Sequence, residues 1–100
     1  MRFANKELVK TLVEKKKALL VDMRSPVHFR DTPIAGAVNL PLRNLVNELV
    51  KIRDKTKPVI LFGVGNNDPE VKAGITYSEN FGFDTYVADH KQLRSTDETK

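Results

Sequence analysis

The order of hydrophobic and polar positions along the chain predicts helices that alternate with short, buried strands. Near the start, apolar residues recur at helical spacing at Leu8, Val9, Leu12 and Val13. Asn5 stands where a helix N-cap is expected, so we predict a first helix that ends near the lysines at 15–17. The apolar run at 18–21 is short, which indicates a strand buried on both faces of a sheet.

The middle of the chain repeats this alternation. Ser25 followed by Pro26 is a good helix start, which predicts a short helical turn through Phe29. Residues 36–41 have the pattern of a short strand closed by a proline. A second amphipathic helix is predicted from the apolar stripe Leu42, Leu45, Val46, Leu49 and Ile52.

The strand predicted at 59–62 leads into a glycine-containing loop and a strong helix start. Asp68 is a candidate N-cap, and Pro69 suits the first helical position. Gly74 inside this helix indicates either close packing or a weak helix. Gly82 is expected just beyond its C-terminal end.

A last strand predicted at 85–88 completes a pattern in which strands alternate with helices. This pattern predicts an α/β fold with a mainly parallel sheet flanked by helices on both faces. Ligands of such sheets bind beyond the carboxyl ends of the strands, which is where the loops at 22–25 and 63–67 are expected. We expect one domain over 1–93 and a polar C-terminal tail over 94–100.

Composition is that of an ordinary globular domain, with 40% hydrophobic and 30% charged residues and a net charge of +4. No apolar run is long enough to span a membrane, and the first residues lack the apolar core of a signal peptide, so we expect a cytoplasmic location. The lysines at 15–17 fit a solvated helix end. Nucleic-acid binding is disfavoured, because no aromatic residue interleaves with them.

The residue types present limit the chemistry. The chain contains no cysteine, which excludes disulfides, thiolate metal sites and cysteine nucleophiles. His28 and His90 are far apart in sequence and lack ligand-like neighbours, so we expect no metal and no other cofactor. We predict a surface or edge position for His28 and an exposed turn position for His90.

The segment Leu19–Leu42 resembles the signature of the rhodanese-like family. In that family a buried strand ends in Asp-x-Arg, a short helix follows, and a His-Ile-Pro-Gly-Ala type segment leads into Asn-x-Pro. The matching residues are Asp22, Arg24, Ile34, Gly36, Ala37, Asn39 and Pro41. Pro33 stands where histidine is usual, and Ala35 where proline is usual. The resemblance extends over about 5–88 and implies the α/β fold of that family.

Members of that family that transfer sulfur carry Cys-x-x-Gly-x-Arg-Ser after the strand that 59–62 resembles. Here Gly63 stands at the cysteine position, Asn66 at the glycine position and Asp68 at the arginine position. The resemblance therefore implies a degenerate active-site loop, the 63–68 loop, which consists of Gly63, Val64, Gly65, Asn66, Asn67 and Asp68. Because Gly63 has no side chain to carry a persulfide, we expect no catalytic residue.

No residue near this loop is expected to replace the missing cysteine as a nucleophile. Ser25 has no evident base beside it, so we expect no alternative nucleophile. Backbone amides at a helix start favour an anion, whereas Asp68 as a cap places negative charge there, which leaves only weak anion binding open. Asp22 and Arg24 are expected to order the loops as a buried, hydrogen-bonded pair and not to act in catalysis.

The leading hypothesis is a catalytically inactive rhodanese-like domain that acts as a binding or regulatory module for a protein partner through its loop rim. The alternative is an accessory subunit of a sulfurtransferase system of the thiosulfate sulfurtransferase type, which relies on a partner's cysteine. A basic module that binds nucleic acid or acidic proteins is a third hypothesis. Homodimerisation is left open, because a small α/β domain can expose an edge strand or an apolar patch.

Overall fold

The computed structural model describes residues 2–65 and 67–94, which form a five-stranded sheet in the order β1-β5-β4-β2-β3. All of the strand pairs in this part of the chain are parallel. The strands are β1 (Arg2–Phe3), β2 (Leu19–Asp22), β3 (Val38–Asn39), β4 (Val59–Phe62) and β5 (Thr85–Val87). The helices are α1 (Lys6–Lys16), α2 (Pro26–Asp31), α3 (Leu42–Leu49), α4 (Pro69–Asn80) and α5 (His90–Arg94). This confirms the predicted α/β class with helices on both faces of a parallel sheet.

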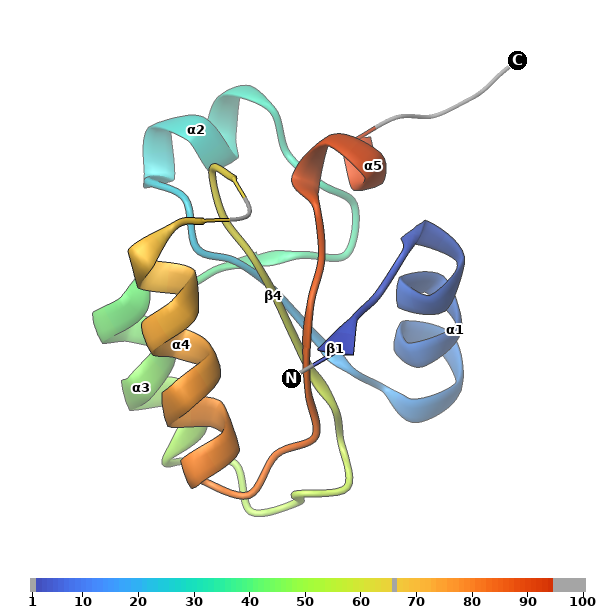
Figure 1. Ribbon diagram of the computed structural model, residues 1–100, viewed down its shortest axis with the longest axis vertical. Helices are drawn as coiled ribbons and strands as arrows, with labels where there is room; N and C mark the ends of the chain where they lie inside the picture. Colours follow the sequence, from blue (N-terminus) through green and yellow to red (C-terminus); the bar gives the residue numbers. More distant parts are fainter. Residues whose placement is uncertain (1, 66, 95–100) are drawn as a thin grey trace.

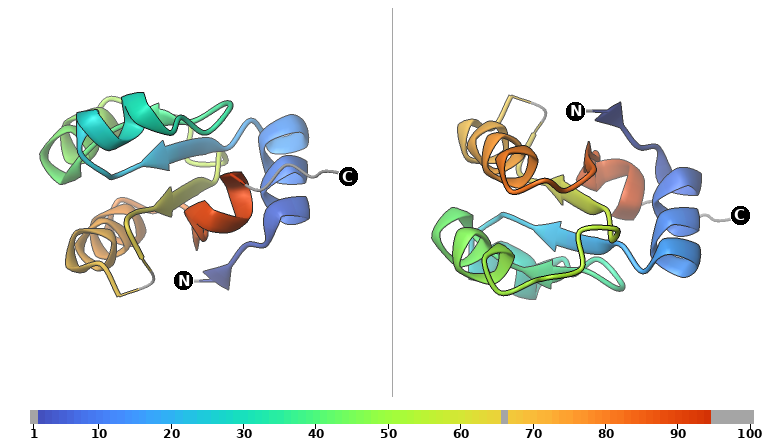
Figure 2. Two further views of the ribbon diagram at one scale, coloured as in Figure 1. Left: turned by 90° about the horizontal axis from the view of Figure 1, so that it is seen from above. Right: turned by 90° about the horizontal axis from the view of Figure 1, so that it is seen from below.

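The helices form two layers around the sheet. Helices α3 and α4 cover one face, and α1 covers the other (Figures 1 and 2). The short helices α2 and α5 lie beyond the end at which the parallel strands finish (Figure 1). The carboxyl ends of the strands are therefore surrounded by loops and short helices, as expected for a site in this class of sheet.

Burial of β4 explains why this strand is central. All four of its residues, Val59–Phe62, are fully buried. Ile60 and Phe62 belong to the core on the α1 side, whereas Val59 and Leu61 belong to the core on the α3 and α4 side. This alternation follows from the period of two in a strand, and it requires apolar residues at every position when both faces are covered.

Helix starts were predicted well because the capping chemistry is local. Asn5, Ser25 and Asp68 cap α1, α2 and α4, and each accepts a hydrogen bond from a backbone N–H of the first turn. Gly82 follows α4 with a φ of +94°, as predicted for a C′ glycine. Of the two alternatives given for Gly74, the structure supports close packing, because a Cβ there would lie 3.0 Å from the Met23 sulfur.

Several boundaries differ from the sequence prediction. The strand expected at 36–41 is only Val38–Asn39, and the helix expected to reach Ile52 ends at Leu49. Strand β1 and helix α5 were not predicted at all, and α5 takes up residues that were assigned to a turn. Both are too short to show a hydrophobic period, and β1 exists only because its backbone pairs with β5.

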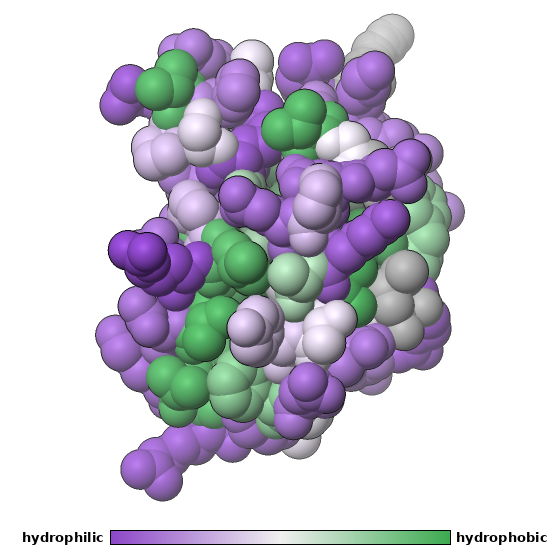
Figure 3. Space-filling view, turned by 60° about the vertical axis from the view of Figure 1, so that its left-hand side comes forward, coloured by the Kyte–Doolittle hydropathy of each residue, from purple (hydrophilic) through white to green (hydrophobic). Residues whose placement is uncertain are grey.

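Apolar side chains are exposed between charged ones on the face formed by α3 and α4 (Figure 3). In this region Val50 is 60% exposed and Tyr77 is 44% exposed. Isolated exposed apolar residues are common on protein surfaces, so these alone do not define an interface. Homodimerisation therefore stays a prediction.

Candidate functional site

The loops after β2 and β4 meet at the carboxyl edge of the sheet and border an open cavity of about 450 Å³. Strands β2 and β4 are neighbours in register, with Asp22 opposite Phe62, so the residues that follow each strand emerge side by side. The cavity is lined by Met23, Arg24, Ser25, Pro26, His28, Pro41, Val64, Asp68 and Glu70. The sequence predicted that both loops lie at this edge of the sheet, but it gave Pro41 only as a motif residue and did not assign Pro41 or Glu70 to a cavity.

Asp22 and Arg24 form a buried ion pair on the inner side of this site. Asp22 is fully buried and Arg24 is 5% exposed. The Arg24 guanidinium donates to Asp22 through Nη2 at 2.7 Å and through Nε at 3.0 Å, and the Arg24 backbone N–H also donates to Asp22 at 2.9 Å. The guanidinium further reaches the hydroxyl and the carbonyl oxygen of Thr32, at 2.8 and 2.7 Å. It therefore joins the end of β2 to the end of α2.

Asn39 adds a third connection to the same cluster. Its side-chain amide donates to the carbonyl oxygens of Asp22 and Arg24, at 3.0 and 2.8 Å. The Asp-x-Arg and Asn-x-Pro motifs, 17 residues apart in sequence, thus hold one another through hydrogen bonds. Since all of these polar groups have partners, the cluster offers no free donor or acceptor with an evident catalytic task.

Gly63 lies at the floor of the site, directly beneath the carboxylate of Asp68. A Cβ on Gly63 would lie 2.4 Å from Asp68 Oδ2 and 2.6 Å from Val71 Cγ2. Both separations are far below any van der Waals contact, so no side chain fits at position 63 while Asp68 and Val71 keep their positions. The space in which the side chain of residue 63 would stand is occupied by a carboxylate.

The Asp68 carboxylate also takes the backbone amides around it. Its Oδ1 accepts from the Glu70 N–H at 2.9 Å, and its Oδ2 accepts from the Val64 N–H at 3.3 Å. These amides belong to the helix start and the preceding loop, which are the groups that would otherwise hold an external anion. The Asp68 carboxylate therefore takes the position of an external anion at the N-terminus of α4.

The rest of the 63–68 loop is at the surface. Val64 is 62% exposed, and Gly65 and Asn67 are exposed as well. Asn66 lies outside the described residues, so its predicted role as a substitute for the family glycine stays a prediction. The loop thus presents an apolar side chain beside a carboxylate.

Ser25 and His28 form a pair that the sequence analysis missed. The Ser25 hydroxyl lies 3.0 Å from His28 Nδ1, and it also accepts from the His28 backbone N–H at 3.4 Å. The expectation that Ser25 has no base beside it was therefore wrong. The spacing of three residues from an N-cap is the signal that could have revealed the contact, because it is the spacing of a capping box.

The Ser25–His28 contact has the form of a helix cap. Both residues are exposed; Ser25 is the N-cap of α2, and His28 lies in its first turn. Acyl transfer by a serine also requires donors for the developing oxyanion. The nearby amides of Val64 and Glu70 already donate to Asp68, so this pair lacks that part of the machinery.

His90 is half-buried at the start of α5, which corrects the expected exposed turn position. Its Nδ1 is buried and has no hydrogen-bond partner within the described residues. Burial lowers the pKa of His90 below its ordinary value, and the charges of Arg24 and Arg94 lower it further, against weaker opposing effects of Asp89 and Asp22. The folded protein therefore favours the neutral imidazole.

This preference predicts a pH-dependent stability. Above pH 6.5, the ordinary pKa of histidine, the imidazole is mostly neutral in both the folded and the unfolded protein. As the pH falls below 6.5, the unfolded chain takes up the proton first, which favours the unfolded state. We expect the melting temperature to fall between pH 7.5 and pH 5.5, and to fall less in His90→Gln. Circular dichroism melts of both proteins measure this, and equal slopes would contradict the assignment.

The described part of the chain contains no group of three or more histidine, cysteine, aspartate or glutamate side chains placed to hold a metal ion. None of its helices has both the length and the apolar composition needed to cross a bilayer. Within residues 2–65 and 67–94, Asp22 and Arg24 form the only ion pair in which both side chains are buried.

The chain is similar in sequence and in fold to known proteins. A family model described as Rhodanese-like domain matches residues 5–91. No match was found among curated protein sequences. Solved structures with the same fold include the Alr3790 protein from Anabaena sp., at 20% identity and a TM-score of 0.68, covering 90% of this chain and 72% of that one.

Two further structures cover the chain to a similar extent. The SSP1007 protein from Staphylococcus saprophyticus is 16% identical with a TM-score of 0.68, over 89% of this chain and 87% of that one. A rhodanese-related protein from Thermoplasma volcanium is 19% identical with a TM-score of 0.67, over 89% of this chain and 84% of that one. Likeness at these identities establishes the fold.

Proposed function

The chain belongs to the rhodanese-like domain family, and on that basis we propose that it is a catalytically inactive member that acts as a binding or regulatory module. The observation that carries the proposal is the Asp68 carboxylate above Gly63, which fills the space of the family's nucleophile. Loss of the cysteine alone would leave an empty anion cradle. In this protein the Asp68 carboxylate occupies that anion-binding position.

The chemistry of sulfur transfer explains why this arrangement is incompatible with catalysis. The reaction requires a thiolate that attacks the outer sulfur of the donor and carries it as a persulfide. The chain has no cysteine, and Gly63 has no side chain. Asp68 places a negative charge where a dianionic donor would have to approach, so the donor is repelled as well.

The surface that supports a binding role is the rim of the same cavity. Val64 lines the cavity together with the carboxylates of Asp68 and Glu70 and is 62% exposed, and Val27, which is 52% exposed, lies between the lining residues Pro26 and His28 in α2. Exposed apolar side chains beside polar ones are typical of protein recognition surfaces. We propose a protein partner for this rim, and a cytoplasmic location for the complex.

The accessory-subunit alternative gains less support. A subunit that contributes substrate binding to a partner's cysteine would need an open anion site, and Asp68 accepts from the two amides that would form it. Purification from the native cell separates the two proposals. A stable complex with a thiol-containing sulfurtransferase would favour the accessory role over the independent module.

Incubation with thiosulfate and cyanide tests the inactive assignment directly. We expect thiocyanate formation at the rate of a protein-free control, because neither a thiolate nor a free anion cradle is present. An active rhodanese-like enzyme measured in parallel verifies the assay. Turnover well above the protein-free rate would overturn the proposal.

A second prediction concerns anion binding at the start of α4. Asp68→Gly should create affinity for sulfate or thiosulfate, because it frees the amides of Val64 and Glu70 and removes the charge above them. The wild type should show no such binding. Thermal shift at constant ionic strength compares the two proteins, with Glu70→Gln as a charge-matched control that leaves the cap in place.

A further inference from the structure

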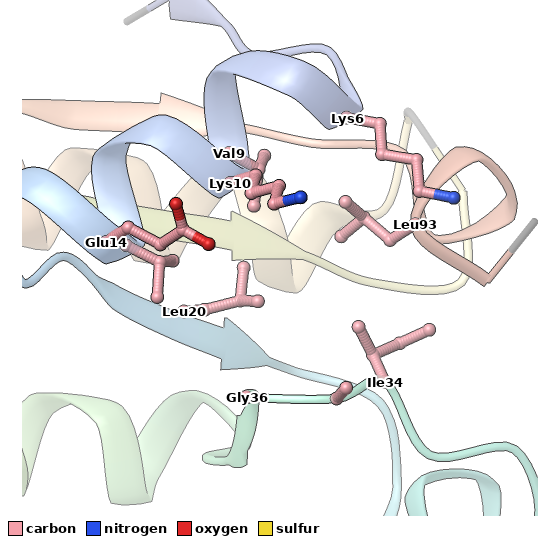
Figure 4. Close-up of a pocket in the computed structure, with 10 residues that line it drawn as sticks. Lys6, Val9, Lys10, Glu14, Leu20, Ile34, Gly36 and Leu93 are labelled. Atoms are coloured by element: carbon pink, nitrogen blue, oxygen red, sulfur yellow. The ribbon is translucent and has the colours of Figure 1, made fainter. Parts of the chain in front are cut away.

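A second cavity of about 430 Å³ lies on the α1 side of the sheet, away from the 63–68 loop (Figure 4). It is open to solvent and is bordered by α1, by the β2 residue Leu20, by the segment 34–36 and by Leu93 of α5. Its apolar lining consists of Val9, Val13, Leu20, Ile34, Ala35, Gly36 and Leu93. No residue of this lining belongs to the cavity between the loops.

The position of the cavity follows from how this face of the sheet is covered. Helices α3 and α4 pack side by side on the opposite face, whereas α1 is the only long helix on this one in the described part of the chain (Figure 2). The short helix α5 covers part of the remaining surface through Leu93, which packs against the core of this side. The space between α1, α5 and the 34–36 segment is left unfilled.

The charged residues of the cavity are divided between its two ends. The ammonium groups of Lys6 and Lys10 lie on the side toward Leu93, whereas the carboxylate of Glu14 lies at the other end, near Leu20 (Figure 4). The end beside Leu93 therefore presents the ammonium group of Lys10 to an otherwise aliphatic cavity.

We propose that this cavity binds an aliphatic carboxylate of about eight to twelve carbons. The chain of the ligand lies among Val9, Leu20 and Ile34, and its carboxylate lies at the ammonium group of Lys10, at the end toward Leu93. The aliphatic lining matches the tail, the volume is in the range of small-molecule sites, and the charge at the lysine end matches the head group. This function is independent of the loop site.

Three ligands with the same tail and different head groups test the assignment. We expect decanoate to bind about three- to fivefold more tightly than decanol or decyltrimethylammonium, because only decanoate complements the lysine end. Isothermal titration below the aggregation concentrations gives the affinities. Amide chemical shifts locate the site, and we expect the largest changes at Val9, Leu20, Ile34 and Leu93.

Charge variants on α1 separate the head-group contact from general electrostatic attraction. Lys10→Met keeps the aliphatic stem and should weaken decanoate binding about threefold without changing decanol binding. Lys15→Met removes the same charge from the opposite side of the helix and should have no effect. Glu14→Gln should strengthen decanoate binding and weaken decyltrimethylammonium binding.

A filling variant tests whether the tail enters the cavity. Val13→Phe should abolish binding of all three ligands while circular dichroism shows a folded protein. Absence of decanoate binding, equal affinity for the three head groups, or equal effects of Lys10→Met and Lys15→Met would each overturn the proposal. Shift changes confined to the loop cavity around Ser25 and Val64 would also overturn it.

Discussion

Arg24→Ala should lower the free energy of unfolding by about 3–5 kcal/mol, the cost of leaving one partner of a buried ion pair alone. Asp22 is fully buried, and among the described residues its carboxylate would keep only the backbone N–H of residue 24 as a partner after the substitution. Thr32 would also lose both guanidinium contacts. Since domains of this size are stable by about 5–15 kcal/mol, the variant should be partly unfolded in mild denaturant.

Urea unfolding of Arg24→Ala measures the effect, and two further variants define its cause. Lys51→Ala removes an exposed lysine that lies 3.8 Å from Glu48, and it should change stability by less than about 1 kcal/mol. The double variant Asp22→Leu with Arg24→Met should be less destabilised than Arg24→Ala, because it leaves no unpaired buried charge. Equal losses in Arg24→Ala and Lys51→Ala would contradict the argument.

The elements that were predictable from the sequence are those whose signal is local. Four consecutive apolar residues define β4, and an N-cap followed by proline defines the starts of α2 and α4. These signals arise from neighbours within one turn or one strand, so they need no knowledge of the rest of the fold. The motif resemblance then supplied the order of the elements in the family.

The elements that were missed depend on distant residues. Strand β1 is two residues long and forms only by pairing with β5, far along the chain. The half-burial of His90 depends on α5 and on the loops around Arg24, which no local pattern reveals. The cavity beside α1 is a gap between several elements, and a gap has no sequence signature.

The relation between Gly63 and Asp68 lies between these two cases. The sequence predicted that Asp68 caps α4 and opposes an anion, but not that its carboxylate stands on top of Gly63. The close approach makes the two residues dependent on one another: the carboxylate fits only because position 63 lacks a Cβ. A cysteine at position 63 is therefore not expected to restore a reactive nucleophile unless Asp68 is also replaced.

Gly63→Cys alone should remain inactive in sulfur transfer and should lose about 2–3 kcal/mol of stability, as expected for overpacking in a closed site. The new Cβ would lie 2.4 Å from Asp68 Oδ2 and 2.6 Å from Val71 Cγ2, so the surroundings must move. The neighbouring carboxylate should also raise the pKa of the introduced thiol and suppress its thiolate. Alkylation by iodoacetamide across a range of pH measures that pKa.

Removal of the carboxylate should reverse this effect. In Gly63→Cys with Asp68→Gly, the amides of Val64 and Glu70 face the introduced thiol at the start of α4, and this environment lowers a thiol pKa. We expect alkylation at pH 7 to be at least about tenfold faster than in Gly63→Cys. Gly65→Cys serves as the control, because a Cβ there meets nothing within 4 Å and its thiol should react at an ordinary rate. If Gly63→Cys reacted as fast as the double variant, Asp68 would not control this site, and its carboxylate would have to lie away from Gly63 in solution.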